Sequence, residues 1–384
     1  MEKITFSPLE KEEKTEVAVI GGGFCGLFAA YLLYKEGKKV AVFEKDDFYA
    51  KKTPPDILQY DAERSLFSLK NKFGSEKALS FFNLEKNAVS ELKSVACEVG
   101  YENFTDKDIF TFSDGGASRK TVEEEYRFRK FAGFDVEFID GKDGLDLFSF
   151  PFECGIYSPK GGAAVDKTDF CSALLCFLSV KGVSLYENTR IDFVTQNDDG
   201  FFIESGDGVS VFSENVFDCR GLSLLSRYPF LGKREAAFFI RTDPVTDFAG
   251  WHNRAFLRDM YAKPLYFLCD SDGRVTVSGF DSFYPKKETG LFGSLFSLLS
   301  ERKISGLEKT FYEYFWQLDA AISEQGVFPY LKTKNGLPVS GEDPIRNGYF
   351  YLSSGNKNTL VSAYVAAKSA VGKLLRKPTA TGLF

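Results

Sequence analysis

The chain has 384 residues, of which 44% are hydrophobic and 27% charged, an ordinary globular composition with enough length for two domains. A formal net charge of −6 and the lack of an extended Lys/Arg block argue against a nucleic-acid partner. Seven cysteines without a CxxC pair, and a single histidine, His252, do not match the patterns of a zinc site or a disulfide framework. We therefore expect no metal site, and free thiols in a reducing compartment.

The N-terminal stretch before residue 17 is charged and acidic, unlike the basic and then apolar start of a signal peptide. Residues 17–34 carry no charge, but the consecutive glycines within them favour a buried strand and helix over a membrane span. The sequence thus predicts a cytoplasmic protein with no integral membrane segment.

Residues 17–45, VAVIGGGFCGLFAAYLLYKEGKKVAVFEK, predict a strand, a glycine turn, a helix over 24–35 and a second strand. The turn contains three glycines in GxGxxG spacing: Gly21, Gly23 and Gly26. The first permits the tight turn, the second lets the backbone approach a pyrophosphate, and the third lets the helix lie close to the strand. The helix directs its free N–H groups and positive dipole end at the phosphates.

Glu44 ends the second strand, near the spacing at which a carboxylate accepts hydrogen bonds from an adenosine ribose. Its charge would repel a 2′-phosphate, so NADP is disfavoured. Together with the glycine turn, this acid predicts dinucleotide binding, which leaves FAD and NAD as the alternatives.

The following residues do not continue a simple nucleotide-binding domain. Residues 61–132 are predicted to be mainly helical and polar, and the pairs Glu123–Arg127 and Glu125–Arg129 indicate a solvated helix face. Nucleotide-domain organisation resumes near residue 163 with a helix, a strand and a hairpin that turns at Asp207–Gly208.

A second, β-rich interruption follows, and the chain then ends with a strand, a glycine turn at Gly355 and a long helix. A nucleotide-binding domain made of three separated segments is typical of flavoproteins and favours FAD.

The segments VIGGGFCGLFAAYLLYKEGKKVAVFEK, VFDCRG, GVFPYLKTKNGLPVSG and GYFYLSSGNKN carry a resemblance to a known family. Over residues 15–376 the chain resembles the D-amino-acid-oxidase-like FAD-dependent oxidoreductases, which include glycine oxidase and glycerol-3-phosphate dehydrogenase. The resemblance implies an α/β fold: a Rossmann-like FAD-binding domain, and an interleaved α+β substrate domain with an antiparallel sheet and helices. The expected FAD-binding segments are 15–80, 155–225 and 326–384, and the expected substrate-domain segments are 81–154 and 226–325.

The resemblance implies FAD as the cofactor, with the adenosine at Glu44, the pyrophosphate over the glycine turn and the flavin ring between the domains. The residues expected to contact FAD are Gly21, Gly23, Phe24, Cys25, Gly26, Glu44, Lys45, Thr53, Ile191, Cys219, Gly221, Gly355, Asn356, Lys357, Asn358, Thr359 and Leu360. The family's reaction is hydride transfer from a substrate carbon to flavin N5, which needs little acid or base catalysis from the protein. We therefore name no catalytic residue, and we interpret His252 as structural.

The chain departs from the family where substrate recognition is decided. Amino-acid-oxidising members carry an arginine in the motif that reads GVFP here, and Phe328 takes its place. A phenyl ring cannot form a bidentate carboxylate clamp. Nearby cations that could substitute are Lys332, Lys334, Arg254, Arg258 and Lys263, and the expected pocket-lining residues are Tyr261, Tyr266, Phe328 and Tyr330. Thr359 stands where relatives have a further glycine, Asn356 where they often have histidine, and Thr53 alone remains of a Ser/Thr-rich loop.

The leading functional hypothesis is an FAD-dependent oxidoreductase that oxidises a small amine or amino-acid-like substrate and passes electrons to oxygen or another acceptor. The alternative within enzymes is an FAD-dependent dehydrogenase of a hydroxy acid or of glycerol phosphate. A third reading is a flavin-binding protein without the ancestral oxidase activity. The oligomeric state is left open.

Overall fold

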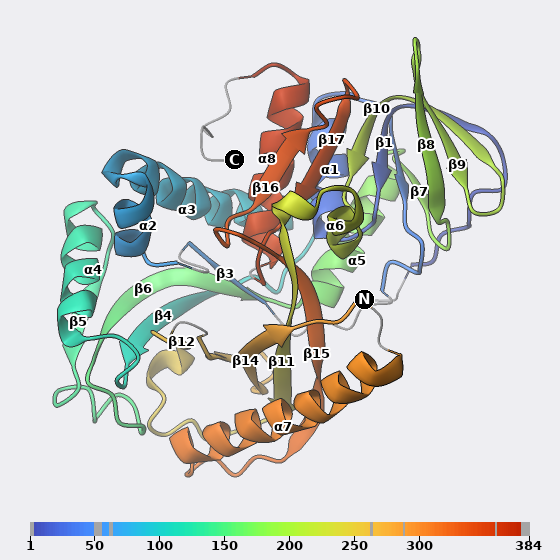
Figure 1. The fold of residues 1–384 in the computed structure, drawn as a ribbon. Helices are drawn as coiled ribbons and strands as arrows, with labels where there is room; N and C mark the ends of the chain where they lie inside the picture. The colour runs from blue at the N-terminus through green and yellow to red at the C-terminus, as the bar shows by residue number, and fades with distance from the viewer. Residues whose placement is uncertain are drawn as a thin grey trace.

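A computed structural model describes residues 4–49, 56–60, 64–261, 264–286, 289–357 and 359–377 (Figure 1). The α-helices are α1 (Phe24–Lys35), α2 (Leu66–Phe73), α3 (Ser75–Glu98), α4 (Arg119–Phe131), α5 (Lys167–Val180), α6 (Leu224–Arg227), α7 (Gly290–Tyr314) and α8 (Thr359–Leu374). The strands are β1 (Glu13–Ile20), β2 (Val40–Phe43), β3 (Asp56–Gln59), β4 (Thr105–Ser113), β5 (Glu137–Asp140), β6 (Cys154–Val165), β7 (Ser184–Tyr186), β8 (Ile191–Asn197), β9 (Gly200–Ser205), β10 (Ser210–Asp218), β11 (Gly232–Thr242), β12 (Phe256–Asp259), β13 (Tyr266–Cys269), β14 (Val275–Phe283), β15 (Ile322–Thr333), β16 (Val339–Glu342) and β17 (Tyr349–Ser353).

The first sheet has the order β16-β17-β10-β1-β2-β7, with β9 and β8 continuing from β10 as an antiparallel hairpin. Strands β17, β10, β1, β2 and β7 run parallel. Helix α1 is the crossover from β1 to β2, whereas the β8–β9 hairpin lies between β7 and β10 in the chain. The predicted helix over 24–35 is confirmed by α1, and the predicted turn at Asp207–Gly208 joins β9 to β10. Gly208 has a φ of 78°, which glycine adopts without strain.

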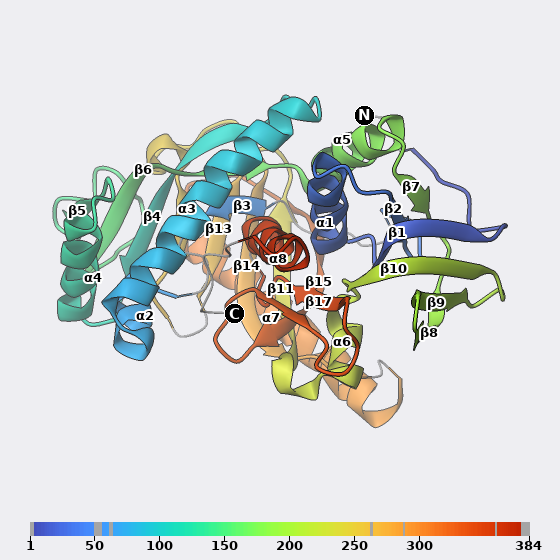
Figure 2. The same ribbon diagram turned by 90° about the horizontal axis from the view of Figure 1, so that it is seen from above.

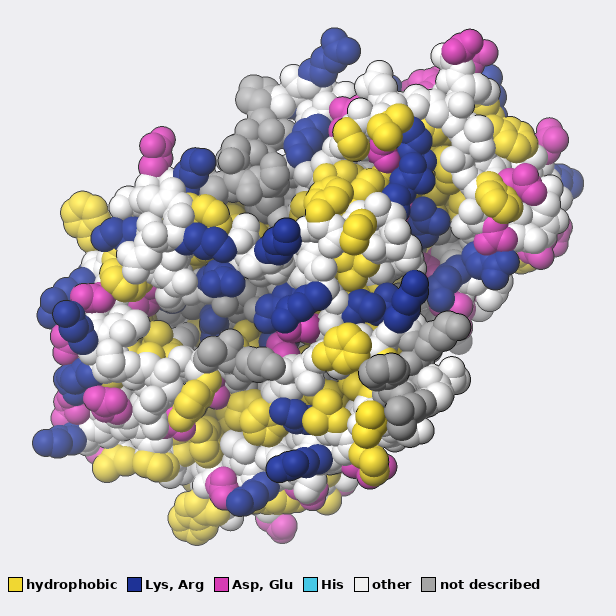
Figure 3. All heavy atoms as spheres, viewed as in Figure 1, with side chains coloured by type: hydrophobic (Ala, Val, Ile, Leu, Met, Phe, Trp, Pro, Cys, Tyr) yellow, Lys and Arg dark blue, Asp and Glu magenta, His cyan; other side chains and the backbone are white. Residues whose placement is uncertain are grey.

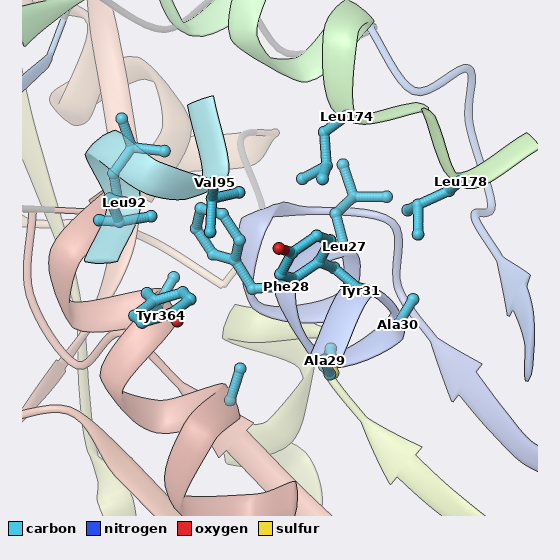
Figure 4. Close-up of a cluster of buried hydrophobic side chains, with 14 of the residues drawn as sticks. Leu27, Phe28, Ala29, Ala30, Tyr31, Leu92, Val95, Leu174, Leu178 and Tyr364 are labelled. Atoms are coloured by element: carbon cyan, nitrogen blue, oxygen red, sulfur yellow. The ribbon is translucent and has the colours of Figure 1, made fainter. Parts of the chain in front are cut away.

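Helices α1, α3, α5 and α8 share one hydrophobic core on a face of this sheet (Figure 4). Leu27, Phe28 and Tyr31 of α1 point toward neighbours on the other three helices. The ring of Phe28 meets the ring of Tyr364 edge-to-face, with the centroids 5.4 Å apart. Seen from above, α8 lies beside α1 (Figure 2), so the C-terminal helix packs against the helix of the first βαβ unit.

The second sheet has the order β15-β11-β14-β13-β12-β4-β6-β3, with β5 paired to β6. It is antiparallel except where β12 lies parallel to β4. Helix α7 covers one face and shares a phenylalanine-rich core with it (Figure 1). The opposite face is directed toward the first sheet and the start of α8.

The expected helical character of 61–132 is confirmed for α2, α3 and α4, but β4 interrupts it. Phe110 and Phe112 of this strand lie in the core under α7 and Ile109 lies on the other face, an alternation that is typical of a strand. The expected domain limits at 155 and 326 fall within β6 and β15. Both strands, and β3, pair in the second sheet, so the chain crosses between the two sheets at these strands.

The expectation that Glu125 and Arg129 form a solvated pair is wrong. Their side chains are almost wholly buried, and Arg129 Nε donates to Glu125 Oε1 over 2.6 Å. The same carboxylate accepts the N–H groups of Leu66 and Phe67 at 2.9 and 2.6 Å, so it binds the first turn of α2. Helix α4 presents this pair inward because α2 and α3 pack against that face, which the sequence of α4 alone does not reveal.

Replacing Arg129 with Met should destabilise the protein by about 3–5 kcal/mol, because it leaves the charge of Glu125 buried without its cation. The matched control is Arg127→Met on the same helix: Arg127 is 72% exposed, and its pair with Glu123 should contribute about 0.3–0.5 kcal/mol. Urea-induced unfolding of the two variants measures the difference. Equal losses of stability would contradict a buried, energetically coupled pair.

Candidate cofactor and substrate site

Four turns meet at one edge of the first sheet. Because β1, β2, β10 and β17 are parallel, their carboxyl ends lie at the same edge, where ligands bind in open α/β sheets. The segments that leave these ends are the glycine turn, Glu44 and Lys45, Cys219 to Gly221, and Gly355 to Lys357. The structure thus brings together most of the residues expected to contact FAD.

The glycine turn is held by contacts that only glycine allows. Gly21 has a φ of 105°, and a Cβ built there would lie 2.8 Å from the carbonyl oxygen of Cys219. A Cβ on Gly26 would lie 1.9 Å from the carbonyl oxygen of Gly21. The side chain of Phe24 packs away from the turn, stacked on Phe170, so its backbone is what faces the sheet edge.

The N-terminus of α1 could bind an anion. Its N-cap is Gly23, no side chain caps it, and its first turn contains no acidic residue. Helix α5, in contrast, is capped by the side chain of Asp166. Free N–H groups at a helix N-terminus suit a pyrophosphate, and a Cβ on Gly23 would meet nothing within 4 Å in the described structure.

Glu44 is fixed in place at the end of β2. Its Oε2 accepts the N–H of Gly22 over 2.7 Å, and its Oε1 accepts the N–H of Asp46 over 3.2 Å. This places the carboxylate beside the glycine turn, as ribose binding requires. Lys45 points to solvent and pairs with Asp46. Ile191 lies buried in the core at the start of β8, where only its backbone could reach a ligand.

The surroundings of the two cysteines at this edge disfavour the thiolate form. Burial raises the pKa of Cys25 to about 12 and the pKa of Cys219 well above its ordinary value. The Cys219 N–H donates to the carbonyl oxygen of Ile20 over 2.8 Å, which ties the end of β10 to the glycine turn. Gly221 follows with a φ of 56° and starts a short 3₁₀ turn.

The turn before α8 carries a buried acceptor without a protein partner. The side-chain amide of Asn356 donates to the Gly336 carbonyl and to Ser362 Oγ, at 2.8 and 3.0 Å. Its Oδ1 is buried and has no hydrogen-bond partner among the described residues. An unsatisfied acceptor at the sheet edge fits a ligand that supplies a donor, such as the N–H or hydroxyl groups of FAD.

Of the other residues expected near this turn, Gly355 has a φ of 71°, and a Cβ there would lie 2.2 Å from the Leu337 carbonyl oxygen. Thr359 and Leu360 form the first turn of α8, with Leu360 buried in the helical core. Thr53 and Asn358 lie outside the described residues.

A buried network of charges covers the start of α8. Lys357 Nζ lies 2.9 Å from Asp281 Oδ1 on β14, and Tyr330 on β15 places its hydroxyl 2.8 Å from Asp281 Oδ2. The same hydroxyl lies 3.2 Å from Glu235 Oε2 on β11. Burial would raise the pKa of Glu235, but the ammonium groups of Lys233 and Lys332 outweigh burial and lower it.

Tyr266 lies at the centre of the same face. The ammonium of Lys357 stands 4.4 Å from its ring centroid, and the guanidinium of Arg258 stands 5.8 Å away. Phe328 stacks on Tyr330 with the rings 14° apart, and the ammonium of Lys167 stands 5.4 Å from the Phe328 centroid.

The structure does not bring Tyr261 to this group. Tyr261 is 46% exposed, and its ring packs over Gly116. Arg254 likewise lies elsewhere, over the ring of Phe248, and Lys263 is outside the described residues.

His252 lies in a short 3₁₀ turn against the rings of Phe148 and Tyr157, which is a packing role. The described residues contain no group of three or more His, Cys, Asp or Glu side chains that could hold a metal ion. Within the same residues, no helix is both long and apolar enough to cross a membrane.

Reasoning from the sequence missed Asp281 and Glu235, which organise this face. The available signal was Glu235, an acid in β11 that is followed directly by the apolar run AAFFI. Residues two apart on a strand point to the same face, so Lys233 lies on the same face as Glu235.

Two glycine substitutions should separate folding from cofactor binding. Gly26→Ala should destabilise the protein by about 1–3 kcal/mol, because the added methyl meets backbone and cannot be accommodated. Gly23→Ala should change apo-protein stability by no more than about 1 kcal/mol, yet weaken FAD binding by about tenfold, the size of one lost charge-assisted hydrogen bond. Thermal unfolding and FAD titration of both apo-proteins test this pair, and an unchanged FAD affinity in Gly23→Ala would contradict it.

Comparisons with known proteins agree with this geometry. The family model described as FAD dependent oxidoreductase matches residues 16–372. Glycine oxidase from Geobacillus kaustophilus is 23% identical over 394 aligned positions, covering 96% of this chain and 95% of that protein. Its crystal structure superposes with a TM-score of 0.77 at 18% identity and 97% coverage of both chains. L-proline dehydrogenase from P. horikoshii gives a TM-score of 0.76 at 15% identity, covering 95% of this chain and 94% of that one. The chain therefore belongs to the FAD-dependent oxidoreductase family of glycine oxidase and related enzymes, and its cofactor is FAD.

Proposed function

We propose that this enzyme oxidises a small amine or amino-acid-like substrate by hydride transfer from a substrate carbon to N5 of FAD, with oxygen or another acceptor reoxidising the flavin. The observation that carries the proposal is the buried group of Tyr266, Asp281, Tyr330 and Lys357, which faces the start of α8. FAD supplies the two-electron chemistry when bound, so the protein has to bind, orient and desolvate the substrate.

The sheet edge supports the placement of FAD in this proposal. The N–H groups at Gly23 to Gly26 would hold the pyrophosphate, Glu44 the adenosine ribose, and the backbone at Ile191 the adenine. Asn356 Oδ1 would accept a hydrogen bond from the flavin end. The FAD-binding segments are then those of the first sheet and its helices, and the second sheet supplies the substrate side. A cytoplasmic location is part of the same proposal.

The charges on the inner face of the second sheet suit a substrate with an amine. The carboxylate of Asp281 attracts an ammonium group through its charge. The face of the Tyr266 ring also attracts an ammonium group, although the ring carries no net charge. The cations Lys357, Arg258 and Lys167 could attract a carboxylate or another anionic group from the same substrate. This arrangement would take over the task that an arginine at position 328 performs in amino-acid oxidases.

The FAD-loaded protein should show flavin absorbance near roughly 375 and 450 nm, and anaerobic addition of one pool of small amines or amino acids should bleach the longer-wavelength band. Pools of hydroxy acids and glycerol phosphate serve as the matched comparison. Bleaching by a hydroxy pool alone would overturn the amine proposal and favour the dehydrogenase alternative. No bleaching by any pool would overturn both.

A further inference from the structure

A continuous chain of hydrogen-bonding groups leads from the start of α8 to the protein surface. It runs from Lys357 Nζ to Asp281 Oδ1 (2.9 Å), from Asp281 Oδ2 to the Tyr330 hydroxyl (2.8 Å), and from that hydroxyl to Glu235 Oε2 (3.2 Å). The last link joins Glu235 Oε1 to Lys233 Nζ over 2.6 Å, and Glu235 Oε2 also lies 3.2 Å from the ammonium of Lys332, a second cation beside this carboxylate. Each group of the chain lies within hydrogen-bond distance of the next.

The inner members of this chain are shielded from water, and the outer member is not. Asp281, Tyr330 and Glu235 are all buried, and the Lys357 side chain is 9% exposed. The Lys233 side chain, at the other end, is 70% exposed. Figure 3 shows Lys and Arg side chains spread over this face of the molecule, among hydrophobic and acidic ones. The chain of hydrogen-bonding groups therefore has a buried end at Lys357 and a solvent-exposed end at Lys233, as a path for protons requires.

Tyr330, at the middle of this chain, has one hydroxyl proton and two carboxylate acceptors within hydrogen-bond distance. A phenolic hydroxyl can donate only one hydrogen bond at a time, yet Tyr330 lies within hydrogen-bond distance of two carboxylates. Its O–H can therefore point to Asp281 or to Glu235. When Asp281 is protonated, the hydroxyl can accept that proton while it gives its own proton to Glu235, so a proton passes between the carboxylates without displacement of a heavy atom.

We propose that Lys357, Asp281, Tyr330, Glu235 and Lys233 form a proton relay between the flavin site and solvent; this inference rests on the proposed function. Oxidation of a protonated amine is R₂CH–NH₃⁺ → R₂C=NH₂⁺ + H⁻ + H⁺. The C–H and one N–H bond break, a C=N double bond forms, the hydride reduces FAD, and one proton must leave. Lys357 accepts that proton as it gives one of its own to Asp281, Asp281 passes a proton to Tyr330 as the Tyr330 hydroxyl gives its own to Glu235, and Glu235 passes a proton to Lys233 as Lys233 releases one to solvent. These residues assist proton movement and do not perform the hydride transfer.

The deciding variant is Tyr330→Phe, which removes one oxygen from the middle of the relay and keeps the ring stacked on Phe328. Stopped-flow reduction of the FAD-loaded variant by the amine that bleaches the wild type should be slower, on the order of 100-fold, at pH values where the amine is protonated. The loss should disappear above the pKa of the substrate ammonium, because no proton then has to leave. A loss of equal size at every pH, or no loss, would overturn the relay.

The matched control is Tyr312→Phe, which removes a tyrosine hydroxyl that donates to the Ala320 carbonyl on the far side of the second sheet. It should leave the rate and its pH profile unchanged. FAD content and thermal unfolding of both variants verify that each is folded. If Tyr330→Phe does not fold, Glu235→Gln interrupts the next link with little change in shape and should give the same pH-dependent loss.

A second measurement keeps the relay testable if no amine reduces the wild type, an outcome that would overturn the proposed function alone. Reduction of bound FAD by two equivalents of the methyl viologen radical cation, a donor that supplies electrons and no protons, takes up one proton from solution, and a pH indicator in weakly buffered solution follows that proton. In the wild type, proton uptake should keep pace with bleaching, and in Tyr330→Phe it should lag behind. Coincident traces in the variant would overturn the relay.

Discussion

The close approach of backbone to backbone at the glycine turn is the constraint on which the rest of the structure depends. Gly26 lies so near the Gly21 carbonyl that any side chain would collide with it, and this contact sets α1 directly against the first sheet. With α1 in that position, α3, α5 and α8 can pack around it in one hydrophobic core. The start of α8 is thereby held at the same sheet edge as the glycine turn.

The second sheet meets this edge through charge as well as through apolar packing. Lys357, just before α8, pairs with Asp281 on β14 and lies over Tyr266 on β13. Such a pair is stable in a buried setting only because each charge also has further partners, as Asp281 has in Tyr330. The contact fixes these side chains relative to the turn before α8, as the proposed hydride transfer to FAD would require.

The single histidine of this enzyme packs against aromatic rings. The polar groups on the inner face of the second sheet could instead transfer the proton that amine oxidation releases. Hydrogen-bonded carboxylate, phenol and ammonium groups move protons along a chain when each lies within about 3 Å of the next. In the proposed relay, the burial of the inner groups would keep bulk water away from the flavin, and the exposed Lys233 at the outer end would exchange protons with solvent. The same residues that hold the second sheet to α8 thus have a chemical use.

The sequence by itself determined the βαβ unit, the glycine turn, the acid at Glu44, the hairpin at Asp207–Gly208 and the flavoprotein family, because these depend on residues close together in the chain. It did not reveal the burial of Arg129, since a helix face reads as solvated until the helices that cover it are known. Nor did it reveal Asp281 and Glu235, because their partners come from strands and a helix start far apart in sequence. Only the tertiary structure could bring these groups together, because strand register and helix docking decide which distant side chains share one buried face.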